Sequence, residues 1–205
     1  MSDAVPMSFL PTPAPEDRAR ADFYALLARL FYAPPDDELL AGIACADELE
    51  SEDATAGLAL AWRDLKLACA ASDEDAAQEE FDSVFVGVGK AEVSPYLGAY
   101  AVAAGSDNPL VELRAFVADL GLARQTSVSE PEDHVAALCE VMRHLILEHP
   151  GDLDLQRDFF ANYVWPGGPA FCAAAAGSGS AVLYKAVARF ALRYMELEHS
   201  AFEMQ

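Results

Sequence analysis

The sequence predicts an all-α protein, a single globular domain of roughly eight to ten helices. Apolar residues recur at spacings of three and four through most of the chain, which is the period of an amphipathic helix. No segment alternates apolar and polar residues, and clusters of Val, Ile and Thr typical of strands are missing. No self-similar repeat occurs at a fixed period, which argues against a solenoid. The chain has 205 residues, 53% of them hydrophobic, so its core needs no metal or disulfide to stabilise it.

The charge balance is strongly acidic. The chain has 34 acidic and 13 basic residues, a net charge of -21. Such a field repels nucleic-acid phosphates and anionic lipid headgroups and attracts cationic segments. Solubility, or adaptation to a saline cytoplasm, is an equally weighted explanation. We therefore expect no nucleic-acid partner.

Cysteine usage and the N-terminus indicate the compartment. The four cysteines form no CxxC pair, so neither a zinc site nor a disulfide framework is indicated. We expect all four to be small core residues in a reducing compartment: Cys45, Cys69, Cys139 and Cys172. The first residues lack the basic and apolar regions of a signal peptide. Nothing approaches the ~20 apolar residues of a membrane span, which predicts a soluble, cytoplasmic protein without a membrane segment.

The first half of the chain reads as a leader and four helices. Residues 1–15 contain four prolines and are predicted to be flexible, with the helical domain covering 16–205. A first helix ends at Pro34 and Pro35, and the acids at 36–38 open a second. Ser72 is expected to cap a fourth helix, which leads to Phe81. The apolar stripes of the first and third helices are Phe23, Leu26, Leu27, Leu30 and Phe31, then Leu58, Trp62, Leu65 and Cys69.

The second half contains four further helical patterns. Asp107 or Asn108 is expected to cap a helix that Gly121 closes. Ser129 and Glu132 are predicted to form a capping box that opens the next helix, with Pro131 in its first turn. A small alanine-rich turn is expected to lead to residues 177–179. The four stripes are Leu110, Leu113, Val117 and Leu120; Val135, Leu138, Met142 and Leu145; Leu155, Phe159 and Tyr163; and Leu183, Val187, Phe190, Tyr194 and Leu197.

The stretch from Phe81 to Tyr100 differs from the rest of the chain. A helical run stops at Gly87, and a loop rich in glycine and proline follows, including Pro95. Loops of this length are usually functional or disordered. Disorder requires low hydrophobicity, yet this loop also carries apolar and aromatic residues such as Tyr96. We expect an ordered surface that faces a partner or a second helical layer.

A search for catalytic motifs finds none. Residues 87–90 read Gly-Val-Gly-Lys, but a phosphate loop needs a glycine where Val84 stands and a hydroxyl where Ala91 stands. Nucleotide binding as a GTP switch therefore stays a minor alternative. Glu140, His144 and Glu148 share a helix face, which keeps a metal-binding bundle as a second alternative, although a solvated face is favoured. No enzyme activity, metal or cofactor is predicted.

His134 follows Glu132 and Asp133 at a predicted helix start. The helix dipole disfavours a protonated imidazole there, so His134 is expected to be neutral or paired with a carboxylate. It either bonds to the central loop as a structural hinge or offers a donor to a ligand. Its position favours the structural role.

Three motifs together resemble the chaperones that mature molybdenum-cofactor oxidoreductases, the TorD/DmsD/NarJ type. The resemblance extends from Glu16 to about Leu197. The motifs are the opening helix FYALLARLFYAPPDDELL, the stretch FDSVFVGVGKAEVSPYLGAY, and EPEDH, which is similar to the E-P-x-D-H hinge motif of that family. Their order and spacing are more specific than any one of them alone.

The resemblance implies a TorD-like, non-enzymatic chaperone. Members bind the leader peptide of a client enzyme, often a twin-arginine signal, and its apo form, so that cofactor insertion is completed before export. A hinge is expected around residues 87–106 and 129–134. The chain is expected to be a monomer or a domain-swapped dimer. By position, the peptide-binding residues would be Val84, Phe85, Gly87, Pro95, Tyr96 and Tyr100 in the groove, and Glu130, Pro131, Asp133 and His134 in the hinge.

The sequence departs from the family pattern in three places. Val84 replaces the usual leucine, Val88 stands where proline often follows the glycine, and Tyr96 stands where tryptophan is common. These departures leave the subfamily and the client open. The residues nevertheless agree with the implied function, because a basic and then apolar leader needs an acidic surface beside an aromatic groove.

Overall fold

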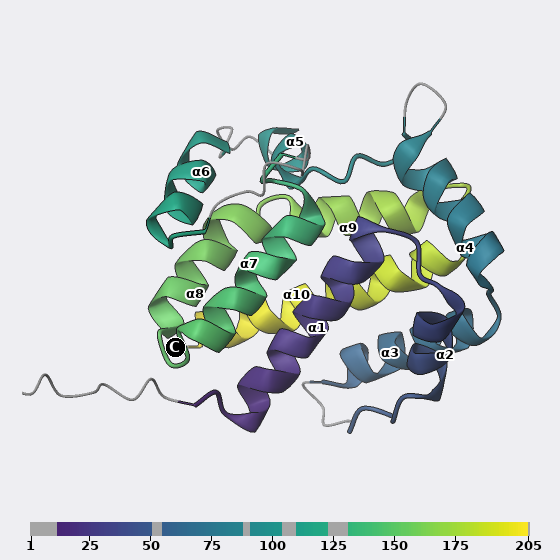
Figure 1. Ribbon diagram of the computed structural model, residues 1–205, viewed down its shortest axis with the longest axis horizontal. Helices are drawn as coiled ribbons and strands as arrows, with labels where there is room; N and C mark the ends of the chain where they lie inside the picture. Colours follow the sequence, from purple (N-terminus) through teal and green to yellow (C-terminus); the bar gives the residue numbers. More distant parts are fainter. Residues whose placement is uncertain (1–11, 51–54, 88–90, 104–109, 123–130, 205) are drawn as a thin grey trace, which may run out of the picture.

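The structure is a computed structural model that describes residues 12–50, 55–87, 91–103, 110–122 and 131–204. Within these ranges it contains ten α-helices, two short π-helices and no strand, which confirms the predicted all-α class (Figure 1). The α-helices are α1 (Pro15–Tyr32), α2 (Asp37–Cys45), α3 (Ala56–Ala70), α4 (Glu74–Phe81), α5 (Leu97–Ala103), α6 (Leu110–Asp119), α7 (Val135–Glu148), α8 (Leu153–Phe159), α9 (Gly168–Gly177) and α10 (Leu183–Glu203). The π-helices are η1 (Asp82–Val86) and η2 (Phe160–Val164).

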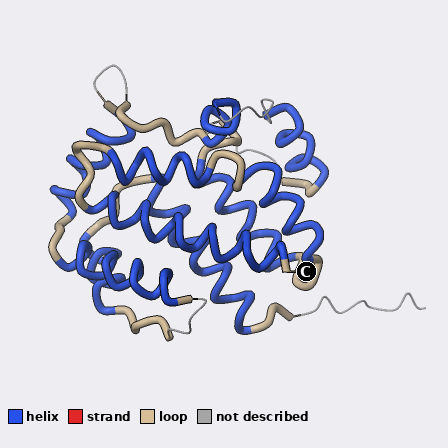
Figure 2. Tube along the Cα trace, turned by 180° about the vertical axis from the view of Figure 1, so that it is seen from behind, coloured by secondary structure: helices blue, strands red, loops and turns tan. Residues whose placement is uncertain are grey.

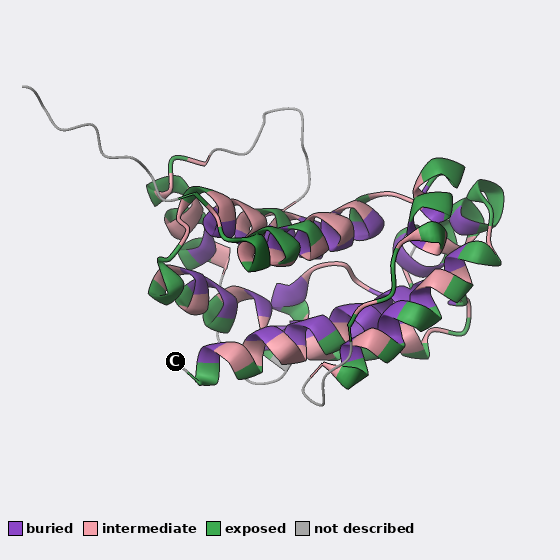
Figure 3. Cartoon of the chain, turned by 90° about the horizontal axis from the view of Figure 1, so that it is seen from below, coloured by how far each residue is buried: buried purple, intermediate pink, exposed green. Residues whose placement is uncertain are grey.

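The longest helix, α10, forms the centre of the domain. Helices α1, α3 and α9 pack against it, α7 packs along α1, and α2 lies beside α3. Seen from behind, the loops connect the helices mainly at the edges of the molecule (Figure 2). Buried residues face the spaces between helices and exposed residues cover the outer faces (Figure 3). The domain therefore has one continuous hydrophobic core.

The predicted apolar stripes of α1, α3, α7 and α10 form this core. Phe23 on α1 contacts Trp62 on α3 and Phe190 on α10, with ring centroids 5.9 and 5.4 Å apart. These edge-on arrangements are the favoured geometry for aromatic pairs. Four stripe residues of α7 are 0–1% exposed: Val135, Leu138, Met142 and Leu145.

An ion pair joins α1 to the far end of α10. Arg20 donates to both carboxylate oxygens of Glu198, at 2.8 and 2.9 Å, and Tyr24 donates to the same carboxylate at 3.1 Å. Burial alone would lower the pKa of Arg20, but the hydrogen bond and charge of Glu198 outweigh it and raise that pKa. Glu198 is 3% exposed, so each charge compensates for the other's loss of water.

The predicted helix boundaries need three corrections. Asp73, one residue after Ser72, is the N-cap of α4 and accepts from the Ala76 N–H. The alanine-rich turn is instead the ten-residue helix α9, because alanine is the strongest helix former. Pro15, assigned to the leader, is the first residue of α1, where its missing N–H costs nothing. The remainder of that leader up to residue 11 lies outside the described residues.

The prediction that all four cysteines lie in the core is confirmed for three of them and wrong for one. Cys69, Cys139 and Cys172 are buried free thiols, as predicted, but Cys45 is exposed at the end of α2, so its assignment to the core was wrong. Among the described helices, none is both long and apolar enough to cross a bilayer.

Candidate functional site

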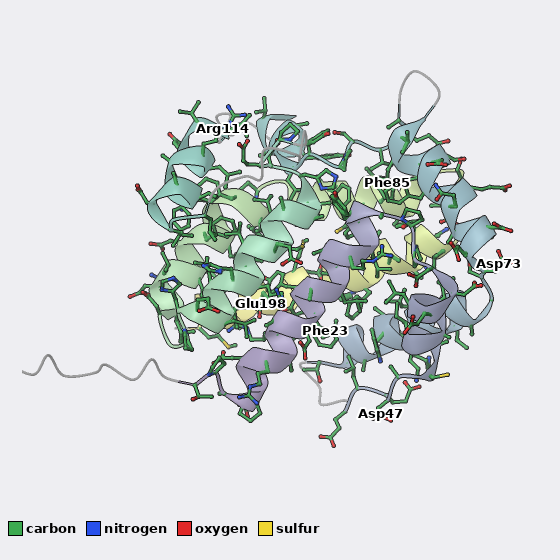
Figure 4. The ribbon with its side chains drawn as sticks, viewed as in Figure 1. Phe23, Asp47, Asp73, Phe85, Arg114 and Glu198 are labelled. Atoms are coloured by element: carbon green, nitrogen blue, oxygen red, sulfur yellow. The ribbon has the colours of Figure 1, made fainter. Side chains whose placement is uncertain are left out.

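The central stretch begins at η1, which continues α4 and places two of its residues in the core. Val84 is 0% and Phe85 is 8% exposed. The Phe85 ring contacts Phe31 at 6.1 Å and Tyr184 at 5.0 Å between centroids. In Figure 4, Phe85 lies toward the α4 side of the molecule, away from Arg114 on α6. These two predicted site residues are therefore core residues that offer little surface to a partner.

Gly87 ends η1 with a φ of 66°, a conformation that favours glycine. Beyond the segment 88–90, which lies outside the described residues, the chain returns to the same place. The Val93 N–H donates to the Val84 carbonyl at 2.9 Å. The Glu92 carboxylate accepts from the Ser178 and Ser180 hydroxyls, and these bonds lower its pKa. The loop is thus tied to η1 and to the connection between α9 and α10.

The loop then pairs with the segment that precedes α7. Tyr96 and His134 form an isolated antiparallel β-bridge. The Leu97 N–H donates to the Asp133 carbonyl, and the Val135 N–H donates to the Pro95 carbonyl, each at 2.9 Å. The Tyr96 ring meets the His134 ring edge-on, with centroids 5.5 Å apart. We call Pro95–Gly98 together with Asp133–Val135 the bridge junction.

The Asp133 side chain fixes the start of α5. Its half-buried carboxylate accepts a hydrogen bond from the Gly98 N–H. Burial raises the pKa of Asp133, and this hydrogen bond opposes the rise. A Cβ on Gly98 would lie 2.6 Å from Asp133 Oδ2, so a larger residue here would push the Asp133 carboxylate out of its present position.

A second glycine, Gly167 at the N-cap of α9, lets the chain pack closely against α5. A Cβ on Gly167, just before α9, would lie 2.3 Å from the Leu97 carbonyl oxygen. Neither close approach of these two glycines could be predicted from the sequence. Their close contacts depend on partners distant in sequence, so the only available signal was their presence in Pro-Tyr-Leu-Gly and Pro-Gly-Gly-Pro.

His134 corrects the predicted start of α7. The helix begins at Val135, and His134 is its N-cap, with Nδ1 accepting from the Ala136 N–H at 3.2 Å. The capping box prediction is wrong because the backbone on either side of His134 is paired with the central loop before the helix starts. Glu132 instead forms an ion pair with Arg114 of α6, with N–O distance 2.9 Å. A nitrogen that accepts carries no proton, so the proton of the neutral ring is on Nε2.

The structure gathers several predicted site residues and separates others. Pro95, Tyr96, Asp133 and His134 meet at the bridge junction. Pro131 accepts from the His134 N–H at 3.2 Å and so closes the turn beside it. Glu130 and Ser129 lie outside the described residues.

Tyr100 lies on α5, in a part of the loop that the sequence did not predict to be helical. Its hydroxyl donates to the Ser94 carbonyl at 3.0 Å, and its ring lies 6.0 Å from Phe171. Burial raises its pKa. Tyr100 therefore connects the bridge junction to the aromatic cluster around Phe85.

The two alternatives from the sequence receive no support from this arrangement. Residues 88–90 of the loop considered for nucleotide binding lie outside the described residues. The described side chains include no group of three His, Cys, Asp or Glu residues that could hold a metal ion. That result covers Glu140, His144 and Glu148, which were the ligands considered for a metal-binding bundle.

Comparison with known protein families shows which family this chain belongs to. A family model described as nitrate reductase delta subunit matches residues 51–173, more than half of the chain. The chain belongs to this family. The matched region contains the bridge junction, α7 and the whole central stretch. The finding confirms the resemblance to the TorD/DmsD/NarJ type that the motifs indicated.

Two relatives carry the name chaperone protein TorD. The protein of Vibrio cholerae serotype O1 is 27% identical over 127 residues, which cover 57% of this chain and 58% of the relative. The protein of Photobacterium profundum is 28% identical over 89 residues, 41% of each chain. The chain thus matches about half the length of these relatives.

Proposed function

We propose that this protein is a system-specific, non-catalytic maturation chaperone of the cytoplasm. Its partner would be a molybdenum-cofactor oxidoreductase, bound through its N-terminal leader peptide and in its apo form until cofactor insertion is complete. Membership of the family and the chaperone relatives support this proposal. The observation that carries it is the bridge junction, where two motifs far apart in sequence meet around Tyr96 and His134.

The physical character of the junction suits an apolar peptide segment. Tyr96 of the junction and Tyr100, farther along α5, are half-buried, so each presents part of an aromatic ring at the surface. The Tyr96 ring is held by the His134 ring, and the Tyr100 hydroxyl is held by the Ser94 carbonyl. Rigid aromatic anchors of this kind supply most of the affinity in peptide interfaces. The net charge of -21 would mainly speed and orient the approach of a basic leader. Val84 and Phe85 would act indirectly, by supporting the loop from the core.

Calorimetric titration with a leader peptide tests the proposal. The peptide should contain a twin-arginine segment followed by an apolar segment. We expect the parent chain to bind it and Tyr96→Ala to weaken binding about tenfold or more, because truncating an interface anchor typically costs over 1 kcal/mol. His134→Ala should also weaken binding, because the buried His134 ring packs edge-on against Tyr96 and caps α7. Tyr32→Ala is the matched control, since Tyr32 is 60% exposed at the end of α1 and has no place in the junction.

Circular dichroism must show that all three variants keep the parent helix content. Equal binding by the parent, Tyr96→Ala and His134→Ala would remove the junction from the binding site. Failure of the parent to bind leaders from any molybdoenzyme would contradict leader recognition itself. Whether the protein acts as a monomer or as a domain-swapped dimer is a separate proposal, which light scattering would decide by the mass in solution.

A further inference from the structure

A pocket of about 330 Å³ lies between α7 and the short segment that follows α6. Its apolar part consists of Leu122, just after α6, with Val141 and Leu147 of α7. Val141 and Leu147 are half-buried and pack against the core, so the apolar part of this pocket is formed by the fold itself. None of these residues belongs to the bridge junction.

Two carboxylates stand at the edge of the pocket. Glu140 and Glu148 are exposed and lie about two turns apart on one side of α7, with His144 between them. Glu140 forms an ion pair with Arg143 of its own helix, at 3.4 Å, and both side chains are about half exposed. An exposed pair within one helix is weak, so a guanidinium from another chain can replace it.

Arg143 also lines the pocket, so the rim carries two carboxylates and one guanidinium. The apolar floor and the excess of carboxylates over cations complement an arginine side chain. The three-carbon stem of arginine packs on apolar surface while its charged head stays at the edge. The planar guanidinium can bond a carboxylate through two parallel N–H groups and can stack on an imidazole such as His144. A lysine ammonium has neither property.

We propose that this pocket binds an arginine side chain of the client leader's basic segment. The inference rests on the proposed function, since it assumes that a leader binds this chain. It also assigns a direction to that leader: its apolar segment lies at the bridge junction and its basic segment lies farther along α7.

The dimensions of α7 allow one peptide to reach both places. A helix rises 1.5 Å per residue, so Glu140 and Glu148 lie about 9 and 21 Å along the axis from His134. An extended peptide spans these distances with about three to seven residues. A leader of ordinary length can therefore contact the junction and the pocket together.

Fluorescence anisotropy with labelled leader peptides tests this assignment. The double variant Glu140→Gln/Glu148→Gln should bind the arginine-containing peptide about tenfold more weakly than the parent, because charge-assisted hydrogen bonds are lost. A peptide with both arginines replaced by glutamine should bind the parent and this variant equally. Glu79→Gln/Glu74→Gln on α4 is the control, because it removes the same charge from exposed positions outside the pocket.

The outcomes separate this inference from the proposed function. If the parent binds, Tyr96→Ala weakens binding and the Glu140→Gln/Glu148→Gln variant binds like the parent, the pocket assignment is overturned while the chaperone proposal stands. A peptide with lysine for arginine that binds as tightly as the original would overturn the guanidinium assignment. Absence of binding by the parent would overturn both proposals. A shift of the His144 side-chain resonances on adding the arginine peptide, absent with the glutamine peptide, would support the placement.

Discussion

The ion pair between α1 and α10 and the bridge junction connect distant parts of the chain in different ways. Around Arg20 and Glu198, long regular helices meet through hydrogen-bonded side chains, of which Glu198 and Tyr24 are buried and Arg20 is 22% exposed. At the junction, two short segments meet through two backbone hydrogen bonds, the hydrogen bond from the Gly98 N–H to the Asp133 carboxylate and one ring contact. The first arrangement uses its polar groups to bind other parts of the same chain. The second leaves half-buried tyrosine rings at the surface.

The comparison separates stability from recognition. Changes in the ion-pair region should lower the free energy of unfolding and leave peptide affinity unchanged in the folded protein. Changes at the junction should lower affinity more than stability.

Glu198→Ala should lower the free energy of unfolding by about 3 kcal/mol, because it leaves the largely buried Arg20 without its main counter-charge. Urea unfolding followed by circular dichroism measures the change. Glu196→Ala is the matched control: it breaks the exposed pair with Arg193, which should cost less than about 1 kcal/mol. Equal losses in the two variants would contradict a special role for the buried pair.

Gly167→Ala should destabilise the chain by about 2 kcal/mol, as overpacking does, because the new Cβ forces the Leu97 carbonyl and the start of α5 to move. It should also weaken leader binding, since Leu97 belongs to the bridge junction. Thermal unfolding and calorimetric titration measure the two effects. Gly177→Ala at the C-terminal end of α9 meets nothing within 4 Å and should change neither by much. Unchanged affinity in Gly167→Ala would separate α5 from the binding site.

The smallest effect concerns pH. Burial raises the pKa of Asp133, so the folded chain holds this proton more tightly than the unfolded chain does. The stability contributed by the protonated carboxyl is complete below the unfolded pKa of about 3.9 and is lost as the pH rises through the raised value. Asp133→Asn keeps an acceptor for the Gly98 N–H but does not titrate. The variant should therefore gain stability relative to the parent as the pH rises from about 4 toward 7.

Urea midpoints of the parent and Asp133→Asn at a series of pH values measure this difference. A difference that is constant over the whole range would show that Asp133 titrates alike in the folded and unfolded chains. A difference that changes in the opposite direction would show that the hydrogen bonds to the Asp133 carboxylate and its electrostatic interaction with His134 together outweigh burial.

The sequence predicted the helices well because their signals are local. The Leu58, Trp62, Leu65 and Cys69 stripe repeats at helical spacing, and all four residues are buried on α3. Gly121 was predicted to close α6, and it does so with a φ of 71°. Both signals depend only on residues within a few positions of one another.

The features that the sequence did not reveal depend on distant partners. Glu80 of α4 caps α10, with its carboxylate accepting from the N–H groups of Val182, Leu183 and Tyr184 at 2.6–3.0 Å. Ser129 and Glu132 form a good local capping signal, yet pairing of Pro95 and Leu97 with the segment around His134 delays the helix until Val135. The two π-helices have no recognised local signal either. The motifs identified the residues of the junction, but only the fold shows how they meet.

Amide hydrogen exchange with and without a bound leader peptide is the most direct test of the central claim that the bridge junction receives the leader. If the junction receives the leader, exchange slows at residues 96–100 and 133–136 when the peptide is added, including the Leu97 and Val135 amides that close the bridge. Exchange around α2 and α3 should not change. A peptide that binds yet slows exchange only at α2 and α3, with the junction unaffected, would contradict the account.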